Sequence, residues 1–300
     1  MKEVAAFQGE RGAFSQVAVR QLLGAKADVC PLPRFADVFA ALKAGKVTAA
    51  VVPIENTLHG SVHENYDHLL HHTHEIVAET SVRIVHNLIA PPGVTLKQIK
   101  RVYSHPVALN QCLKWFASHK GVEPETFYDT AGSVKMLMED RPEASAAIAS
   151  EVAASIYGAR ILERSIEDDS QNYTRFFLLR RKGAKARPAS TGGEWKTSLV
   201  FSTCNATGSL FRALAAFALR DLNITKIESR PIRGKWEYLF YLDFLGHAES
   251  PAAKNALAHL GEVADMCRVL GCYPRGDGAF ISPKSTSAPQ RRSKNTRTRA

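Results

Sequence analysis

The chain has 300 residues, 45% of them hydrophobic and 23% charged, which is the composition of a soluble globular protein with two or three packed units. No apolar run approaches the roughly 18 residues of a membrane helix, so we expect no membrane partner. The formal net charge of +10 is concentrated near the C-terminus, and the five scattered cysteines are typical of reduced thiols rather than of a disulfide framework.

The first 181 residues alternate short apolar strands with helical patterns, which indicates an α/β architecture. The first strand pattern begins at once, without the apolar stretch and cleavage site of a signal peptide, so we expect a cytoplasmic protein. The expected strands are 4–7, 49–53, 83–90, 101–105, 146–150 and 175–181, with helices over 15–23 and 35–44.

A stretch rich in Lys, Gly, Ala and Ser over 182–195 is typical of a linker, and we expect a second domain over 196–275. Its elements follow in the order βαββαβ, which is that of a ferredoxin-like module with a turn at Gly234. The expected elements are strand 196–203, helix 208–223, strands 224–232 and 236–246, helix 251–264 and strand 267–274. The last 17 residues hold six Lys or Arg and no acid, so we expect 276–300 to be a disordered basic tail without a specific nucleic-acid partner.

Small and polar side chains follow three of the expected strands, at the edge where open α/β sheets bind their ligands. After the first strand, Ser15 in GERGAFS lies at a helix start that favours an anion. After the second, Asn56 and Thr57 suit hydrogen bonding to a small polyoxygenated ligand. The third leads through Ser104 to Gln111. Each stretch is also compatible with an ordinary capped turn.

Two other kinds of site are not expected. Five histidines lie within 63–74, and His68 and His72 would share a helix face as two metal ligands can. No H-E-x-x-H motif occurs, and histidines on several helix faces are more typical of a solvated or packed surface, so we expect no metal. Ser104 and His105 are no hydrolase pair, because adjacent side chains do not normally point at each other and no G-x-S-x-G motif occurs.

Six stretches occur in the order and spacing of one family, namely AAFQGERGAFSQVA, VVPIENTLHGSV, YSHPVALNQC, DTAGS, NYTRFFLL and ESRP. Over about residues 4–275 the sequence therefore resembles prephenate dehydratases, to which arogenate dehydratases are closely related. The resemblance implies a bilobed catalytic domain over 1–181, like the type 2 periplasmic binding proteins, with the substrate between the lobes. It also implies that the βαββαβ module is an ACT domain that binds phenylalanine.

The resemblance implies a reaction in which prephenate loses carbon dioxide and water to give phenylpyruvate. No metal or other cofactor is expected, because the ring that becomes aromatic accepts the electrons. Thr174 is the implied hydrogen-bond donor to the departing hydroxyl. Asn56, Ser104 and Gln111 are the implied hydrogen-bond partners of the substrate. The other expected substrate-binding residues are Ser15, Thr57, Arg175 and Phe176.

Two side chains near this site have alternative interpretations. Arg175 suits a bidentate pair with a substrate carboxylate, but an arginine at the start of a strand also suits a bridge to Asp168 or Asp169. Glu55 is expected to order the cleft, with Asp129 of the other lobe as its carboxylate partner.

Phenylalanine is expected to inhibit the enzyme from the ACT interfaces of a homodimer or homotetramer. The GAL stretch of the family is GSL here, so the affinity for the effector is open. The expected effector-binding residues are Gly208, Ser209, Leu210, Glu228, Ser229, Arg230 and Pro231. The alternative functions are an arogenate dehydratase, whose substrate has an amino group in place of the keto group, and a non-catalytic amino-acid sensor.

Overall fold

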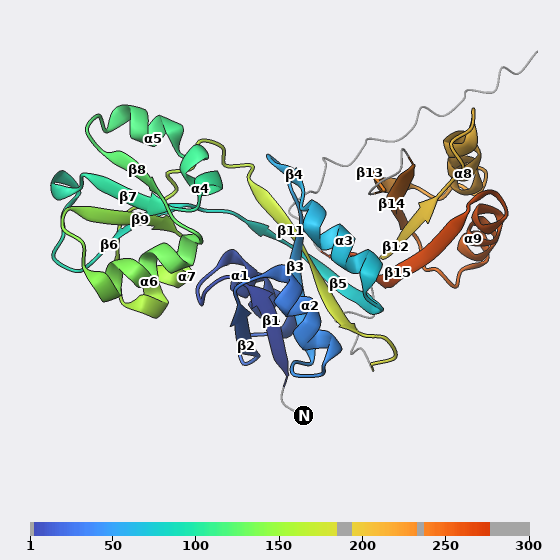
Figure 1. The fold of residues 1–300 in the computed structure, drawn as a ribbon, viewed down its shortest axis with the longest axis horizontal. Coiled ribbons are helices and arrows are strands. Elements are labelled where there is room, and N and C mark those ends of the chain that lie inside the picture. The colour runs from blue at the N-terminus through green and yellow to red at the C-terminus, as the bar shows by residue number, and fades with distance from the viewer. Residues whose placement is uncertain (1–2, 185–193, 233–236, 277–300) are drawn as a thin grey trace, which may run out of the picture.

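The computed structural model describes residues 3–184, 194–232 and 237–276, which form three separate sheets (Figure 1). Two sheets come from the N-terminal part of the chain and the third from the C-terminal part. Most of the expected linker, the turn at Gly234 and all but the first residue of the expected tail lie outside the described residues.

The first lobe contains a six-stranded sheet in the order β2-β1-β3-β11-β5, with β4 paired to β3. Strand β11 comes from much later in the chain and runs antiparallel to both of its neighbours. The strands are β1 (Val4–Gln8), β2 (Asp28–Leu32), β3 (Ala49–Asn56), β4 (Gly60–Ser61), β5 (His74–Arg83) and β11 (Tyr173–Arg181), and the helices are α1 (Phe14–Leu23), α2 (Phe35–Lys43) and α3 (His63–His71).

The second lobe contains a five-stranded sheet in the order β10-β6-β9-β7-β8. Its strands are β6 (Asn87–Ala90), β7 (Arg101–Ser104), β8 (Glu123–Thr126), β9 (Ser145–Ala149) and β10 (Arg160–Glu163), and its helices are α4 (Pro106–Asn110), α5 (Leu113–Ser118), α6 (Thr130–Asp140), α7 (Glu151–Tyr157) and the short 3₁₀ helix η1 (Leu96–Gln98). The chain passes between the lobes twice, from β5 to β6 and from β10 to β11, which confirms the predicted bilobed domain (Figure 1).

The strands that the sequence did not predict share one property. Apart from the two-residue β4, which pairs with β3, these strands are β2, β5, β8 and β10, and all four lie at the edges of their sheets. An edge strand is exposed on one side and tolerates proline and charge, so its residues lack the apolar pattern of a central strand. The predicted strand over 83–90 was also too long, because β6 begins at Asn87 and the preceding residues connect the lobes.

The third sheet is antiparallel with the order β13-β14-β12-β15, and its elements confirm the predicted βαββαβ order. Helices α8 and α9 cover one of its faces, and the first lobe covers the other (Figure 1). The expected boundaries of the two domains stay predictions. The elements are β12 (Trp195–Ser202), α8 (Ser209–Ala218), β13 (Ile224–Pro231), β14 (Tyr238–Leu245), α9 (Pro251–Val263) and β15 (Met266–Pro274).

The C-terminal module packs tightly against the first lobe. Leu239 and Tyr241 of β14 belong to the same apolar cluster as Phe177 of β11. Strand β15 passes so close to β5 that a Cβ atom on Gly271 would lie 2.2 Å from the carbonyl oxygen of Ile76. Only glycine permits this approach of the two backbones. Within the described part of the chain, no helix has the length and apolar character needed to cross a membrane.

Candidate active site at the β3–β11 strand pair

The candidate site begins where β3 and β11 end their pairing. Thr174 of β11 lies opposite Asn56, and Arg175 lies opposite Glu55. Because successive side chains of a strand point to opposite faces, these two rungs belong to different faces of the sheet. Strand β3 was predicted to end at Pro53 but continues through Asn56, so the polar residues of IEN lie on the strand and not in a loop after it.

Pro53 explains why the strand looked complete at that point. Between Arg175 and Phe176 of β11 the register shifts from Glu55 to Pro53, so Ile54 is passed over. Proline lacks the N–H that a regular ladder needs, and such residues are accommodated at bulges. The shift turns Glu55 to the same face as Arg175.

On the first face, Asn56 fixes the hydroxyl of Thr174. The Asn56 Nδ2 donates to Thr174 Oγ1 at 3.0 Å and to Asn172 Oδ1 at 2.8 Å. Its Oδ1 accepts from the backbone N–H groups of Leu58 and His59 at 2.9 and 3.0 Å, so the amide has one defined orientation. Because the Thr174 oxygen accepts this bond, its own O–H hydrogen is available to another acceptor.

The same chain of bonds reaches the second lobe through Gln111, which follows α4. Asn172 Nδ2 donates to Gln111 Oε1 at 2.9 Å, and His86 Nε2 lies 2.8 Å from the same oxygen. Burial lowers the pKa of His86, so the ring is neutral with its hydrogen on Nε2. The Gln111 oxygen thus accepts two hydrogen bonds, from Asn172 and from His86. The NH₂ group of Gln111 is left to donate to a ligand. We call Thr174, Asn56, Asn172, Gln111 and His86 the Thr174 network.

Asn172 and His86 were not among the expected site residues. Asn172 is fully buried, and His86 is 2% exposed. The sequence NYTRFF contained a signal for Asn172. This residue precedes Thr174 by two positions, and residues two positions apart in an extended segment point to the same side. His86 carried no signal of its own, because it lies on a connection between the lobes whose course depends on the fold.

Three expected site residues have their polar atoms engaged within the protein. The Ser104 side chain is fully buried, and its Oγ donates to the carbonyl of Ile148 at 2.6 Å. Thr57 Oγ1 donates to the carbonyl of Gln171 and accepts from the N–H of Tyr173, which fixes the entry into β11. Asn56 likewise holds the network rather than presenting a free end.

Two further expectations for substrate contacts meet different surroundings. Helix α1 begins at Phe14 with Ala13 at its N-cap, so Ser15 is not the cap and is 8% exposed. Phe176 is 2% exposed and packs in the apolar core of the first lobe with Leu178, which corrects its expected role in the site. The reason is the alternation of β11, which turns this ring inward beneath α1.

Arg175 faces the C-terminal βαββαβ module, which corrects both interpretations of its partner. Its Nε donates to Glu79 Oε2 and its Nη1 to Asp243 Oδ2, each at 2.7 Å. Burial alone would lower the pKa of Arg175, but Asp243 and Glu79 outweigh it and the pKa rises. Asp168 instead accepts from the backbone N–H groups at the start of α5. The guanidinium therefore has no free donor pair for a substrate carboxylate.

The expected carboxylate pair of Glu55 and Asp129 does not form. Glu55 Oε1 accepts from Lys226 Nζ of the C-terminal module at 2.9 Å. Asp129 caps α6 by accepting from the N–H of Gly132 at 2.7 Å, and burial raises its pKa. Arg175 and Glu55 lie on the same face of the strand pair, so both point toward the C-terminal module and away from the second lobe.

A cavity of about 360 Å³ lies beside the strand pair. It is lined by Glu55, Asn56, Thr57, Gly60, Ser81, Tyr173 and Arg175. Among the residues that the structure describes, no group of three or more His, Cys, Asp and Glu side chains is arranged to hold a metal ion.

The expected effector residues are divided between the start of α8 and the two faces of β13. Gly208 has a φ of 79° and precedes α8, where Ser209 and Leu210 line a cavity of about 110 Å³. In β13, however, Glu228 accepts from Ser61 Oγ at 2.8 Å, and Arg230 lies 3.4 Å from Asp67. These two side chains therefore bind the first lobe, whereas Ser229 and Pro231 are exposed.

Comparison with known proteins identifies the family. The family model for prephenate dehydratase matches residues 5–184, and that for the ACT domain matches 197–262. An arogenate dehydratase/prephenate dehydratase of Arabidopsis thaliana is 43% identical over 279 residues, which cover 90% of this chain and 72% of the relative.

Two solved structures share the complete described fold. A prephenate dehydratase from Arthrobacter aurescens in complex with L-Phe is 34% identical with a TM-score of 0.82, covering 91% of this chain and 90% of that chain. A protein described as a novel type of quorum quenching acylase is also 34% identical, with a TM-score of 0.83 and coverage of 91% and 98%. By its sequence and both of its domains, the chain belongs to the prephenate dehydratase family and carries an ACT domain.

Proposed function

We propose that this lyase removes carbon dioxide and water from prephenate, or from its amino analogue arogenate, at the Thr174 network. The observation that carries the proposal is the orientation of Thr174. Its oxygen accepts from Asn56 at 3.0 Å, so its hydrogen is free to meet a departing oxygen.

The reaction makes a specific demand on the site. As the carboxylate on the ring leaves as carbon dioxide, the electrons of the broken C–C bond enter the ring. The ring C–O bond then breaks, and the hydroxide that leaves takes up a proton to become water. A hydrogen bond from Thr174 stabilises the developing negative charge on that oxygen. The free NH₂ group of Gln111 is suited to hold a carboxylate of the substrate.

Two matched variants test the role of the hydroxyl. Thr174→Val keeps the shape of the side chain and removes its hydrogen bond, and Thr174→Ser keeps the hydroxyl. We expect Thr174→Val to lower kcat by about 100- to 1,000-fold with little change in KM, because the bond strengthens in the transition state. Thr174→Ser should retain most of the activity. A Thr174→Val protein with the kcat of the wild type would remove Thr174 from the mechanism.

Separate assays of the purified protein with prephenate and with arogenate determine which of the two is the substrate. Formation of phenylpyruvate from the first or phenylalanine from the second identifies the preferred side chain. Activity on neither would favour the non-catalytic amino-acid sensor. Because one similar structure is described as an acylase, release of free amine from an N-acylated substrate is the third assay.

We further propose phenylalanine as the effector and the α8 end of the ACT domain as its site. The Arthrobacter aurescens relative was solved with L-Phe, and in this chain Ser209 and Leu210 line a cavity at the start of α8. Phe211 of α8 and Leu219 directly after it are 75% and 74% exposed, which supports an assembly of two or four chains through this domain. Light scattering tests the assembly, and calorimetry tests the binding of phenylalanine.

The cytoplasmic location stays a prediction, since the Arabidopsis relative is named chloroplastic.

A further inference from the structure

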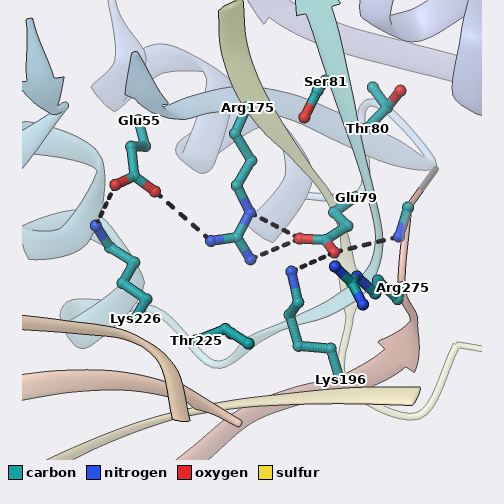
Figure 2. Close-up of a pocket in the computed structure, with 10 residues that line it drawn as sticks. Glu55, Glu79, Thr80, Ser81, Arg175, Lys196, Thr225, Lys226 and Arg275 are labelled. Carbon is teal, nitrogen blue, oxygen red and sulfur yellow. Dashed lines mark hydrogen bonds and ion pairs between the residues drawn. The ribbon is translucent and has the colours of Figure 1, made fainter. Parts of the chain in front are cut away.

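The rung that carries the site is directly beside a rung that is held by the ACT domain. Thr174 and Asn56 are opposite each other, and Arg175 and Glu55 are opposite each other in the next position. The second rung lines a cavity of about 220 Å³ between the domains (Figure 2). Because adjacent residues share one backbone, a shift of the charged rung displaces the hydroxyl and the amide of the other.

Arg175 takes two of its three hydrogen-bond partners from the ACT domain. Its Nη1 donates to Asp243 of β14 at 2.7 Å, and its Nη2 donates to Tyr273 of β15 at 3.2 Å. Its remaining strong partner is Glu79 of β5, which also lies 2.6 Å from Lys196 of β12. The Arg175 side chain is only 14% exposed, so the orientation of its guanidinium depends on these neighbours rather than on solvent.

Glu55 is held in the same way. Lys226 of β13 donates to it at 2.9 Å, and Arg175 lies 3.8 Å from its other oxygen (Figure 2). The Lys226 side chain is 10% exposed and also donates to Ser61 of β4. Both members of the charged rung are therefore completed by the ACT domain.

The ACT side of this contact is itself rigid. Asp243 Oδ1 accepts from Ser198 Oγ of the neighbouring strand β12 at 2.5 Å, and Ser198 lies 2.6 Å from the hydroxyl of Tyr273. Asp243 thus belongs to a fixed hydrogen-bonded group across three ACT strands. A buried pair of this kind has a demanding geometry, because each charge loses its compensation when the partner moves.

We propose that Asp243 and Lys226 are positioning residues, which hold Arg175 and Glu55 and thereby set the Thr174 network in its active geometry. The proposal rests on the proposed function and adds to it a physical connection from the ACT domain to the catalytic hydroxyl. A change in the ACT sheet that moves Asp243 also moves Arg175, which is joined to Thr174 by a peptide bond. Effector binding would use this connection to lower activity.

The test uses the full-length protein with Asp243→Asn, Lys226→Gln and the control Glu249→Gln. Glu249 pairs with Lys254 at 2.7 Å on the exposed surface of the same domain, so the control removes an acidic charge away from the contact. We expect Asp243→Asn to lower kcat about ten-fold with KM nearly unchanged, and Lys226→Gln to do so more weakly. The L-phenylalanine concentration for half inhibition should shift by about five-fold or more in Asp243→Asn. Glu249→Gln should match the wild type.

The double variant Arg175→Gln/Asp243→Asn gives the decisive comparison. If the two residues act as one unit, its loss of kcat is smaller than the product of the two single losses. Circular dichroism and a melting curve establish that each variant is folded at the assay temperature, and if Asp243→Asn is not, Lys226→Gln carries the test. Wild-type kcat and half inhibition in a folded Asp243→Asn or Lys226→Gln protein would overturn the proposal. Inactivity of the wild type on both substrates would instead overturn the proposed function. If phenylalanine does not inhibit the wild type, the kcat values of Asp243→Asn and Lys226→Gln alone decide whether these are positioning residues.

Discussion

The two faces of the β3–β11 pair use opposite kinds of chemistry. On one face, Thr174 and Asn56 take part in a chain of neutral hydrogen bonds that ends at Gln111 of the second lobe. On the other, Arg175 and Glu55 take part in a cluster of ion pairs that ends in the ACT domain. Because side chains alternate between the two faces of a strand, residues that are adjacent in the chain have different functions here.

The difference follows from what each face must do. A hydrogen bond between amides and hydroxyls fixes direction without adding charge, which suits a site where the orientation of one O–H group matters. Ion pairs act over a longer distance and bind two domains across a cavity, but they lose stability sharply when one partner is removed. The neutral face is suited to orientation and the charged face to attachment.

Among the variants that compare the two faces, the largest effect is expected where the chain of neutral hydrogen bonds is cut. Asn172→Ala removes the amide that joins Asn56 to Gln111, so the Asn56 Nδ2 loses one acceptor and the Gln111 oxygen keeps only His86. We expect kcat to fall roughly 100-fold, or about 3 kcal/mol of transition-state stabilisation. Steady-state kinetics with the preferred substrate measures it.

A matched variant controls for the loss of an asparagine side chain. Asn255 is exposed on α9 of the ACT domain, so Asn255→Ala should leave kcat at the wild-type value. Equal kcat values for Asn172→Ala and Asn255→Ala would show that the neutral chain of bonds does not organise the reaction.

The sequence was sufficient for features that are local in the chain. The strand that begins near Thr174, the polar residues after the apolar part of β3 and the βαββαβ order all follow from patterns within a few residues. Recognition of the motifs added the identity of the leading hydroxyl. None of these features depends on which distant segments come into contact.

The partners of the site residues could not be predicted in the same way. Arg175 had two acids nearby in the sequence, yet it pairs with Glu79 and Asp243, which are 96 and 68 positions away. Which face an arginine occupies depends on the register with β3, and that register shifts at a bulge. A shift of one residue turns each side chain to the opposite face, so sequence spacing alone leaves its partner open.

The second effect concerns the attachment of the charged face. Gly271→Ala places a methyl group 2.2 Å from the carbonyl oxygen of Ile76, where β15 passes β5. The ACT sheet must move away from the first lobe, so we expect the free energy of unfolding to fall by about 2 kcal/mol. Denaturant titration measures it. Activity should fall less than in Asn172→Ala, because this change reaches the Thr174 network only through the charged rung and removes none of its hydrogen bonds.

The control for this variant is another glycine of the same domain. Gly261 lies within α9 and has no atom within 4 Å of an added Cβ. Gly261→Ala should raise the free energy of unfolding by up to about 1 kcal/mol, because alanine favours the helix. If Gly271→Ala proved as stable as Gly261→Ala, the close approach of β15 and β5 would not hold the domains together.

The smallest effect is expected from a comparison of two buried carboxylates. Asp243 lies beside the cation of Arg175, and Asp129 lies at the start of α6. Burial tends to raise the pKa of Asp243, but Arg175 and the hydroxyl of Ser198 outweigh it and the pKa is lowered. For Asp129, burial outweighs the N–H groups of α6 and the pKa is raised. The two aspartates should therefore respond to pH in opposite senses.

Asp129→Asn tests this difference, because asparagine keeps the helix cap and removes the charge. The raised pKa means that the fold favours protonated Asp129, so its stabilising contribution is complete below the unfolded pKa of about 4 and is lost as the pH rises through the folded value. At pH 7 the variant should therefore melt above the wild type, by less than Gly271→Ala melts below it, and the gain should fade toward pH 4. Asp243→Asn should behave in the opposite way, since the lowered pKa makes ionised Asp243 stabilising at pH 7 and that contribution is lost in acid. Melting curves from pH 4 to pH 8 that run parallel for both variants would mean that Arg175 does not set the difference between the two carboxylates.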